Sequence, residues 1–343
     1  MQQSANRESA SEHKGQGRRA LVAGATGYIG RAVVRELLDR GWQVVALVRQ
    51  LQADPVLQAY LSGAELRVWD AGSSKAADSQ DIPEGHFDAV FSCIASRSGS
   101  KVDAWRVEHD ANVELLRKLQ HRCGHFVLLS AICVQRPRLA FQEAKLAFEA
   151  ALQRSDVPWT IVRPTAFFKS LAGQVERLKR GKPYLLFADG SLTACKPISQ
   201  SDLAVYLCDC VDDRSRHFQV LSVGGPGPAL TPRQQGELLF SLLGLTPRFK
   251  SVPVALFDVI ITVMSALGVL LPALRDKAEY ARIGRYYATE SMLLWDEQQQ
   301  RYDADATPEF GGDTLEAFYR QVITDGMQGQ ELGEAALFDR SGR

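Results

Sequence analysis

Three glycines near the start of the chain have the spacing of a phosphate-binding turn. The segment GATGYIG follows an apolar stretch and precedes an amphipathic one. Gly24 permits a tight turn, Gly27 lets the backbone approach a pyrophosphate, and Gly30 lets a helix pack closely on a strand. Free N–H groups at the start of that helix favour an anion. The sequence therefore predicts dinucleotide binding, the alternative being a retained fold with an empty site. The predicted contacts from this turn are Gly24, Thr26, Gly27, Tyr28, Ile29 and Gly30.

Two arginines lie near the position that decides whether such a site binds NAD or NADP. The second predicted strand ends at Arg49, where an Asp or Glu would hold the ribose 2′-hydroxyl of NAD, and Arg31 begins the preceding helix. Guanidinium groups suit a 2′-phosphate, so NADPH is the predicted cofactor. The alternative is that Arg49 is only a solvated strand end. Asp70, at the end of the third strand, is expected near the adenine ring.

Apolar strands alternate with helical segments from Arg19 onward, a pattern typical of a parallel sheet covered by helices. The predicted fold class is α/β, with a Rossmann-type doubly wound parallel sheet. We expect the NADP-binding Rossmann domain over residues 19–225 and a mainly helical, substrate-covering lobe over residues 226–343. Residues 1–18 are polar and are predicted to be a disordered tail. The seven expected strands lie within residues 19–25, 42–49, 65–72, 87–96, 125–131, 159–170 and 218–225.

Several segments together resemble the atypical short-chain dehydrogenases, the branch that contains isoflavone-reductase-like and NmrA-like proteins. The resemblance is carried by GATGYIG, Arg49, Ser130, Lys145, VRPTAFFKS and KPISQSDLA. Within that branch, FQEAKLAFE, PWTIVRPTAFFKSLAGQVERLKRGKPYLLFADG, CKPISQSDLAVYLCDCV and YYATESMLLWD resemble the divinyl chlorophyllide 8-vinyl reductase family, from about Arg19 to about Gly326. This implies NADPH-dependent conversion of the 8-vinyl group of a divinyl chlorophyllide or protochlorophyllide to ethyl, in chlorophyll biosynthesis.

One position departs from the short-chain dehydrogenase pattern. Those enzymes place Tyr-x-x-x-Lys after a strand that ends in serine, whereas this chain has Ser130 and then Phe141-x-x-x-Lys145. The tyrosine protonates an oxygen as hydride reaches the carbon, and a vinyl group has no such oxygen. Phe141 is then either an apolar wall against a flat macrocycle or a core residue, and both leave the chemistry possible.

The resemblance also implies roles for further residues. Lys145 is the expected catalytic residue and holds the nicotinamide ribose hydroxyls, the alternative being a surface lysine on an amphipathic helix. Ser130, Pro164 and Thr165 are expected at the cofactor, and Phe167 and Phe168 are expected with Phe141 as the substrate wall.

Composition constrains the partners and the compartment. Forty basic and forty acidic residues cancel, so no nucleic-acid partner is indicated. The six cysteines are scattered through apolar segments and are interpreted as reduced thiols, and no metal site is predicted, Cys208-x-Cys210 included. No apolar signal segment precedes the first strand, so we expect a cytoplasmic protein of a phototrophic bacterium. The sequence does not indicate an oligomeric state.

Two C-terminal segments leave alternatives open. Residues 254–274, VALFDVIITVMSALGVLLPAL, have borderline length for a membrane span but contain Asp258. Buried packing, a macrocycle wall or a peripheral membrane contact is favoured over a span. Residues 275–290 mix basic and aromatic side chains, which suits a solvated helix face or contacts to a tetrapyrrole. A rival from another class is a non-catalytic NADP-binding protein, a redox sensor or an assembly factor for a photosynthetic complex.

Overall fold

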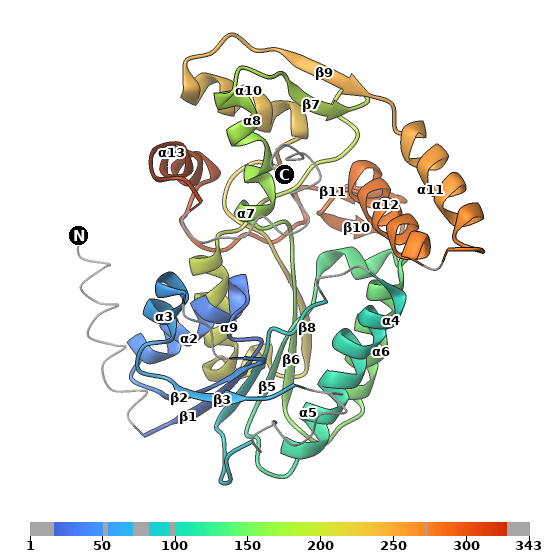
Figure 1. Cartoon of the computed structure of the whole chain (residues 1–343). Helices are drawn as coiled ribbons and strands as arrows, with labels where there is room; N and C mark the ends of the chain where they lie inside the picture. Colours follow the sequence, from blue (N-terminus) through green and yellow to red (C-terminus); the bar gives the residue numbers. More distant parts are fainter. Residues whose placement is uncertain (1–16, 51–53, 71–81, 97–99, 272, 328–343) are drawn as a thin grey trace.

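A seven-stranded parallel sheet forms the centre of the molecule (Figure 1). The computed structural model describes residues 17–50, 54–70, 82–96, 100–271 and 273–327. The strand order is β3-β2-β1-β4-β5-β6-β8, so the order reverses between β1 and β4. All seven predicted strands are present, which confirms the doubly wound α/β class. Their bounds are β1 Arg19–Ala23, β2 Gln43–Val48, β3 Glu65–Val68, β4 Ala89–Ser92, β5 Phe126–Leu129, β6 Trp159–Pro164 and β8 Gln219–Val223.

Helices cover both faces of this sheet (Figure 1). On one face α2 (Tyr28–Asp39) packs against α3 (Pro55–Leu61) and α9 (Gln200–Asp212). The other face is covered by α4 (Lys101–Ala104), the π-helix η1 (Trp105–Asp110), α5 (Ala111–Leu119) and α6 (Ala140–Gln153). Because both faces are covered, the central strands are continuous apolar runs, and β4 is fully buried.

The upper lobe combines chain segments from both sides of β8 (Figure 1). Strand β7 (Tyr184–Phe187) pairs in parallel with β9 (Phe249–Val252). A separate apolar core joins residues 168–186 to residues 239, 240 and 315–322. The boundary at residue 225 stays a prediction, and the packing adds residues 168–187 to the lobe. The helices of the lobe are α7 Phe168–Leu171, α8 Val175–Lys179, α10 Pro232–Leu243 and α13 Leu315–Asp325.

The apolar segment 254–274 contains one complete helix and the start of a second. Helix α11 (Ala255–Leu267) ends before α12 (Ala273–Thr289) begins, and the two pack against each other. Within the described residues no helix is both long enough and apolar enough to cross a membrane. No residue of α11 is buried, so the expectation of buried packing was wrong. Two short strands, β10 (Leu294–Asp296) and β11 (Arg301–Asp303), follow α12.

Candidate cofactor and substrate site

The glycine turn joins β1 to α2 with the geometry that a dinucleotide needs. Gly24 has φ +78°, and a Cβ there would lie 2.5 Å from the carbonyl oxygen of Cys93. Gly27 is the N-cap of α2 and provides no side-chain cap, and the first helical turn has no acidic residue. The N–H groups at this helix start are therefore available for a phosphate. A Cβ at Gly30 would collide with the backbone of Gly24, so this glycine permits close helix–strand packing.

Arg31 has the features of an anion-binding residue. Its side chain is 5% exposed, and its Nε has no hydrogen-bond partner among the described residues. The guanidinium lies 4.8 Å from the ring centroid of Tyr60 and 5.6 Å from that of Tyr28. A buried charged group with an unsatisfied donor is costly unless a ligand completes it. Together with the glycine turn, Arg31 shows that these residues fit a nicotinamide dinucleotide.

One cavity of about 1610 Å³ extends from the glycine turn to the underside of the lobe. Pockets for drug-sized ligands measure roughly 300–1,000 Å³, so this cavity has room for a dinucleotide and a second large ligand. Fourteen of the predicted site residues line it, and Gly30 and Phe168 do not. The lining set comprises Gly24, Thr26, Gly27, Tyr28, Ile29, Arg31, Arg49, Asp70, Ser130, Phe141, Lys145, Pro164, Thr165 and Phe167.

Phe168 is a correction to the predicted substrate wall. Its side chain is 2% exposed and packs in the lobe core, with its ring centroid 5.5 Å from that of Phe318. Residue 168 begins α7, and its buried face lies toward the lobe. Phe167, the N-cap residue of that helix, faces Tyr28 at a centroid distance of 6.1 Å and lines the cavity.

Lys145 is held by a carboxylate that sequence reasoning missed. Its Nζ lies 2.7 Å from Oε2 of Glu108, and the two side chains are 11% and 4% exposed. Glu108 lies on η1 (Trp105–Asp110), a π-helix, and its Oε1 accepts a hydrogen bond from the backbone N–H of Ser96. π-Helical turns occur frequently at functional sites. The pair fixes the ammonium at the cavity wall.

The hydroxyls near the expected nicotinamide position are engaged with the protein. Ser130 Oγ donates to Oε1 of Glu149 at 2.5 Å, and Glu149 also pairs with Arg163. Thr165 Oγ1 donates to the backbone oxygen of Lys196. A carbonyl-reducing site needs a hydroxyl directed at the substrate oxygen. Here Ser130 lines the cavity while its hydroxyl is directed to Glu149.

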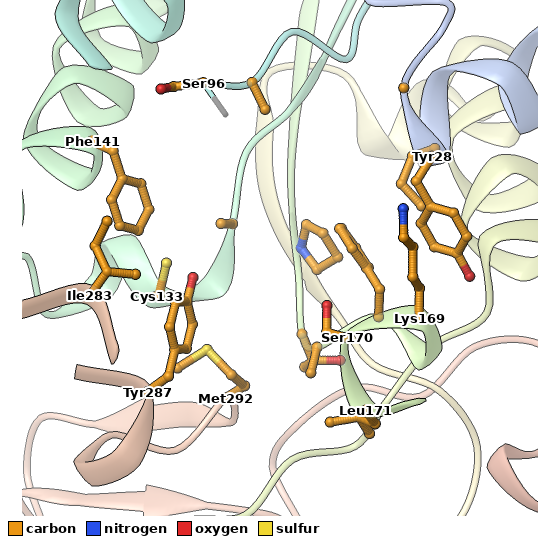
Figure 2. Close-up of a pocket in the computed structure, with 18 of the residues that line it drawn as sticks. Tyr28, Ser96, Cys133, Phe141, Lys169, Ser170, Leu171, Ile283, Tyr287 and Met292 are labelled. Carbon is orange, nitrogen blue, oxygen red and sulfur yellow. The ribbon is translucent and has the colours of Figure 1, made fainter. Parts of the chain in front are cut away.

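The far wall of the cavity is mainly apolar and comes from two separate chain segments. Figure 2 shows Phe141, Ile283, Cys133 and Met292 with Tyr287 on one side, opposite Tyr28, Lys169 and Ser170. Burial raises the pKa of the Cys133 thiol, so this thiol adds no charge to the wall. The charged side chains on this side of the cavity are Lys145, its partner Glu108, and Glu290, which pairs with Arg136 and Arg138. Phe141 both packs against the cluster that contains Cys133 and lines the cavity, so its two interpretations coexist.

The wall residues from α12 were not identified from the sequence. Tyr280, Ile283, Gly284 and Tyr287 recur at intervals of three or four, which places them on one helix face. That spacing is present in the sequence, where residues 275–290 were interpreted either as a solvated helix face or as contacts to a tetrapyrrole. Because residues far apart in the chain form this wall, the spacing alone did not indicate which ligand the face meets.

Comparisons with known proteins support a nicotinamide-binding enzyme fold. A family model described as NAD(P)H-binding matches residues 24–214. A UDP-glucose 4-epimerase of Thermotoga maritima, solved with UDP-glucose, has a TM-score of 0.61 and 17% identity, covering 89% of this chain and 97% of that one. At this identity the likeness shows the fold alone.

Sequence relatives are much more similar. A protein of Oryza sativa subsp. indica named divinyl chlorophyllide a 8-vinyl-reductase, chloroplastic, is 49% identical over 331 residues, covering 93% of this chain and 82% of its own. The photosystem II assembly factor Ycf39 of Synechocystis is 28% identical over 163 residues, 46% of this chain and 47% of that protein. The plant relatives are chloroplastic and give no support to a bacterial cytoplasmic protein. The chain belongs to the divinyl chlorophyllide a 8-vinyl-reductase family.

Proposed function

We propose that the chain is an NADPH-dependent reductase that converts the 8-vinyl group of a divinyl chlorophyllide or protochlorophyllide to ethyl. The main support is that one cavity runs continuously from the glycine turn, beside Arg31 and Arg49, to the apolar wall around Phe141. A flat, largely apolar macrocycle suits that wall. The family membership gives the reaction, and the cavity gives a place where both ligands meet.

The residues of the first half would hold the cofactor. The α2 N-terminus and Gly27 receive the pyrophosphate, Arg31 and Arg49 receive a 2′-phosphate, and Lys145 holds the nicotinamide ribose. NADPH supplies the hydride. Glu108 fixes Lys145, and Pro164 and Thr165 complete the cofactor side of the cavity. Exact placement matters because a misplacement of about 1 Å costs on the order of a hundredfold in rate.

The absence of a phenol at Phe141 agrees with reduction of a carbon–carbon double bond. Negative charge that develops on the substrate spreads into the conjugated macrocycle, so no oxyanion needs stabilisation beside α6. The same feature would also suit the rival, a non-catalytic binding protein. The assembly-factor relatives that would favour it match 45–54% of this chain, whereas the reductase relatives match 92–93% of it.

A peripheral membrane contact belongs to the same proposal. The loop after α11 exposes Val269, Leu270 and Leu271 by 71%, 81% and 58%, and α11 exposes Val259 and Val263. Leu256 and Phe257, on the same helix, line the cavity. An exposed apolar patch that continues into the substrate cavity suits an amphiphilic substrate taken from a lipid surface. We propose the chlorophyll-forming compartment as the location, and the names of the relatives favour a plastid.

The experiment combines purified protein, NADPH and divinyl chlorophyllide a, with product followed by absorption and mass. The proposal predicts an 8-ethyl product two hydrogens heavier and an equal amount of NADP⁺. Divinyl protochlorophyllide in a parallel reaction identifies the preferred tetrapyrrole. Tight NADPH binding without conversion of either tetrapyrrole would favour the non-catalytic rival instead.

A further inference from the structure

The apolar wall of the cavity has no tyrosine on α6, but it has one on α12. Phe141 occupies the position of the usual tyrosine, and Tyr287 lines the same cavity from the C-terminal lobe. Figure 2 shows Tyr287 next to Cys133, with Phe141 and Ile283 on the same wall. A hydroxyl is thus present on this wall, although it belongs to a residue 146 positions after Phe141 in the chain.

Cys133 links the Tyr287 hydroxyl to the expected reaction centre. The raised pKa of this thiol has burial as its largest cause, and hydrogen bonds from Gln142 and Tyr287 and the charge of Lys145 oppose it. Tyr287 is therefore a hydrogen-bonding neighbour of Cys133, and Lys145 lies within electrostatic reach of the same sulfur. This arrangement places a phenol and an ammonium around one side chain, as a tyrosine–lysine pair on one helix would.

Tyr287 also differs from its neighbour in access to the cavity. Tyr287 is 42% exposed, whereas Tyr286 is 4% exposed and donates its hydroxyl to the backbone oxygens of Cys133 and Arg136. The two rings are perpendicular, at a centroid distance of 5.7 Å. The Tyr286 phenol is buried and held by hydrogen bonds to the backbone. The Tyr287 phenol is exposed, so it can exchange protons with water.

Three other titratable groups of the cavity, on Lys145, Tyr28 and Cys133, suit proton donation less well. Lys145 is committed to Glu108 at 2.7 Å. Tyr28 lies on the opposite wall, and burial raises its pKa above the ordinary value. The Cys133 thiol is buried, and burial raises its pKa, which makes it a weaker acid than an exposed thiol.

We propose that Tyr287 is the proton donor for vinyl reduction, an inference that rests on the proposed function. Hydride from the reduced nicotinamide, which is thereby oxidised, forms a C–H bond at the terminal vinyl carbon. The π-electron pair of the vinyl group moves to the inner carbon and the macrocycle. The inner carbon then forms its C–H bond with the hydroxyl proton of Tyr287, whose O–H bond breaks. The phenolate then regains a proton from water.

Tyr287→Phe tests the proposal, with Tyr286→Phe as a matched control on the same helix. General acids contribute roughly a hundred- to ten-thousandfold, so Tyr287→Phe is expected to lower kcat by about a hundredfold or more. Its NADPH affinity, measured by fluorescence of the bound dinucleotide, should stay at the parental level. Tyr286→Phe should lower the unfolding midpoint, because it loses a buried hydrogen bond, while it keeps the parental kcat.

The outcomes separate this inference from the proposed function. A parent protein that leaves divinyl chlorophyllide a unchanged contradicts the function itself. An active parent with an equally active Tyr287→Phe variant contradicts only the proton donor, as does an equal loss of kcat in both variants. If Tyr287→Phe unfolds, Tyr287→His replaces the donor by an imidazole. Its turnover should then increase as the pH falls through about 6.5, and a flat profile would overturn the proposal.

Discussion

Lys145 on α6 and Glu108 on the η1 π-helix form a buried ion pair, with Nζ 2.7 Å from Oε2, at the wall of the large cavity. The pair joins the segment that carries the expected catalytic lysine to the segment that follows β4. Glu108 is held in turn by the N–H of Ser96. The position of the ammonium therefore depends on two elements rather than on the surface of one helix.

Lys145→Met is expected to raise the KM for NADPH and to lower kcat by on the order of a hundredfold, since a misplaced ribose misaligns the hydride. It should also cost roughly 3–5 kcal/mol of unfolding free energy, because Glu108 stays buried without its partner. Urea unfolding and steady-state kinetics measure both effects. Lys118→Met, which removes a partly exposed pair with Glu114, is the control. Unchanged kinetics in Lys145→Met would remove this lysine from the site.

Arg49→Ala should weaken NADPH much more than NADH, because only NADPH has a 2′-phosphate. A charge-assisted contact contributes about 1.5–3 kcal/mol, which corresponds to roughly ten- to a hundredfold in affinity. Arg31→Ala should likewise weaken NADPH more than NADH. The Nε of Arg31 has no hydrogen-bond partner among the described residues, and Arg31 lines the same cavity. Arg35→Ala is the control, because Arg35 on the same helix pairs with Asp39 at the surface. Equal weakening of both dinucleotides by Arg49→Ala would contradict the assignment.

Phe141→Tyr should leave vinyl reduction within a few-fold of the parental rate. The added hydroxyl would lie on an apolar wall, and the substrate develops no oxyanion there for it to stabilise. Steady-state kinetics with the tetrapyrrole provide the measurement. A large rate gain would show that proton donation from position 141 had been limiting, against the assignment of that step to Tyr287.

Most of the seven strands were predictable because they are apolar runs next to turn signals, while the edge strand β3, ELRV, alternates charged and apolar residues. The glycine spacing predicted the cofactor end of the sheet. The Lys145–Glu108 pair was not predictable, because Glu108 lies in a charged stretch, WRVEHD, that has the composition of a solvated helix. Ser130 lines the cavity and its place at the cofactor stays a prediction, while its hydroxyl partner Glu149, nineteen residues away on α6, was not foreseen. Phe168 was misassigned because, at the start of α7, a shift of one residue decides whether a side chain faces the cavity or the core of the lobe.

The exposed apolar side chains of α11 and of the loop after it predict binding to lipid vesicles. The parent should co-sediment with phosphatidylcholine–phosphatidylglycerol vesicles, and Val263→Glu with Leu270→Glu should weaken this by at least about tenfold, since buried charge is costly in a bilayer. Val102→Glu, at a residue 79% exposed on α4, is the matched control. Equal loss in the control, or a vesicle-independent dimer that the α11 substitutions dissociate, would contradict a lipid contact.

His125 predicts acid sensitivity of the fold. Burial, and then the charge of His217, lower its pKa from 6.5 to about 4, so the folded state prefers neutral imidazole. The unfolded state binds the proton first as the pH falls, and unfolding free energy is lost between about pH 6.5 and 4. The difference of about 2.5 in pKa corresponds to roughly 3 kcal/mol. Urea unfolding across this range should show a flatter profile for His125→Gln, whereas exposed His121→Gln should retain the parental slope.

The central claim is hydride transfer to a vinyl carbon, and NADPH deuterated at the transferable C4 position tests it most directly. Divinyl chlorophyllide a would be converted in H₂O, and the product fragments would be analysed by mass and nuclear magnetic resonance. We expect one deuterium per product, in the methyl group of the new 8-ethyl substituent, and no deuterium elsewhere in the macrocycle. An 8-ethyl product without deuterium, or with deuterium on the inner carbon, would contradict the proposed direction of addition. An unchanged divinyl substrate would contradict the proposed function itself.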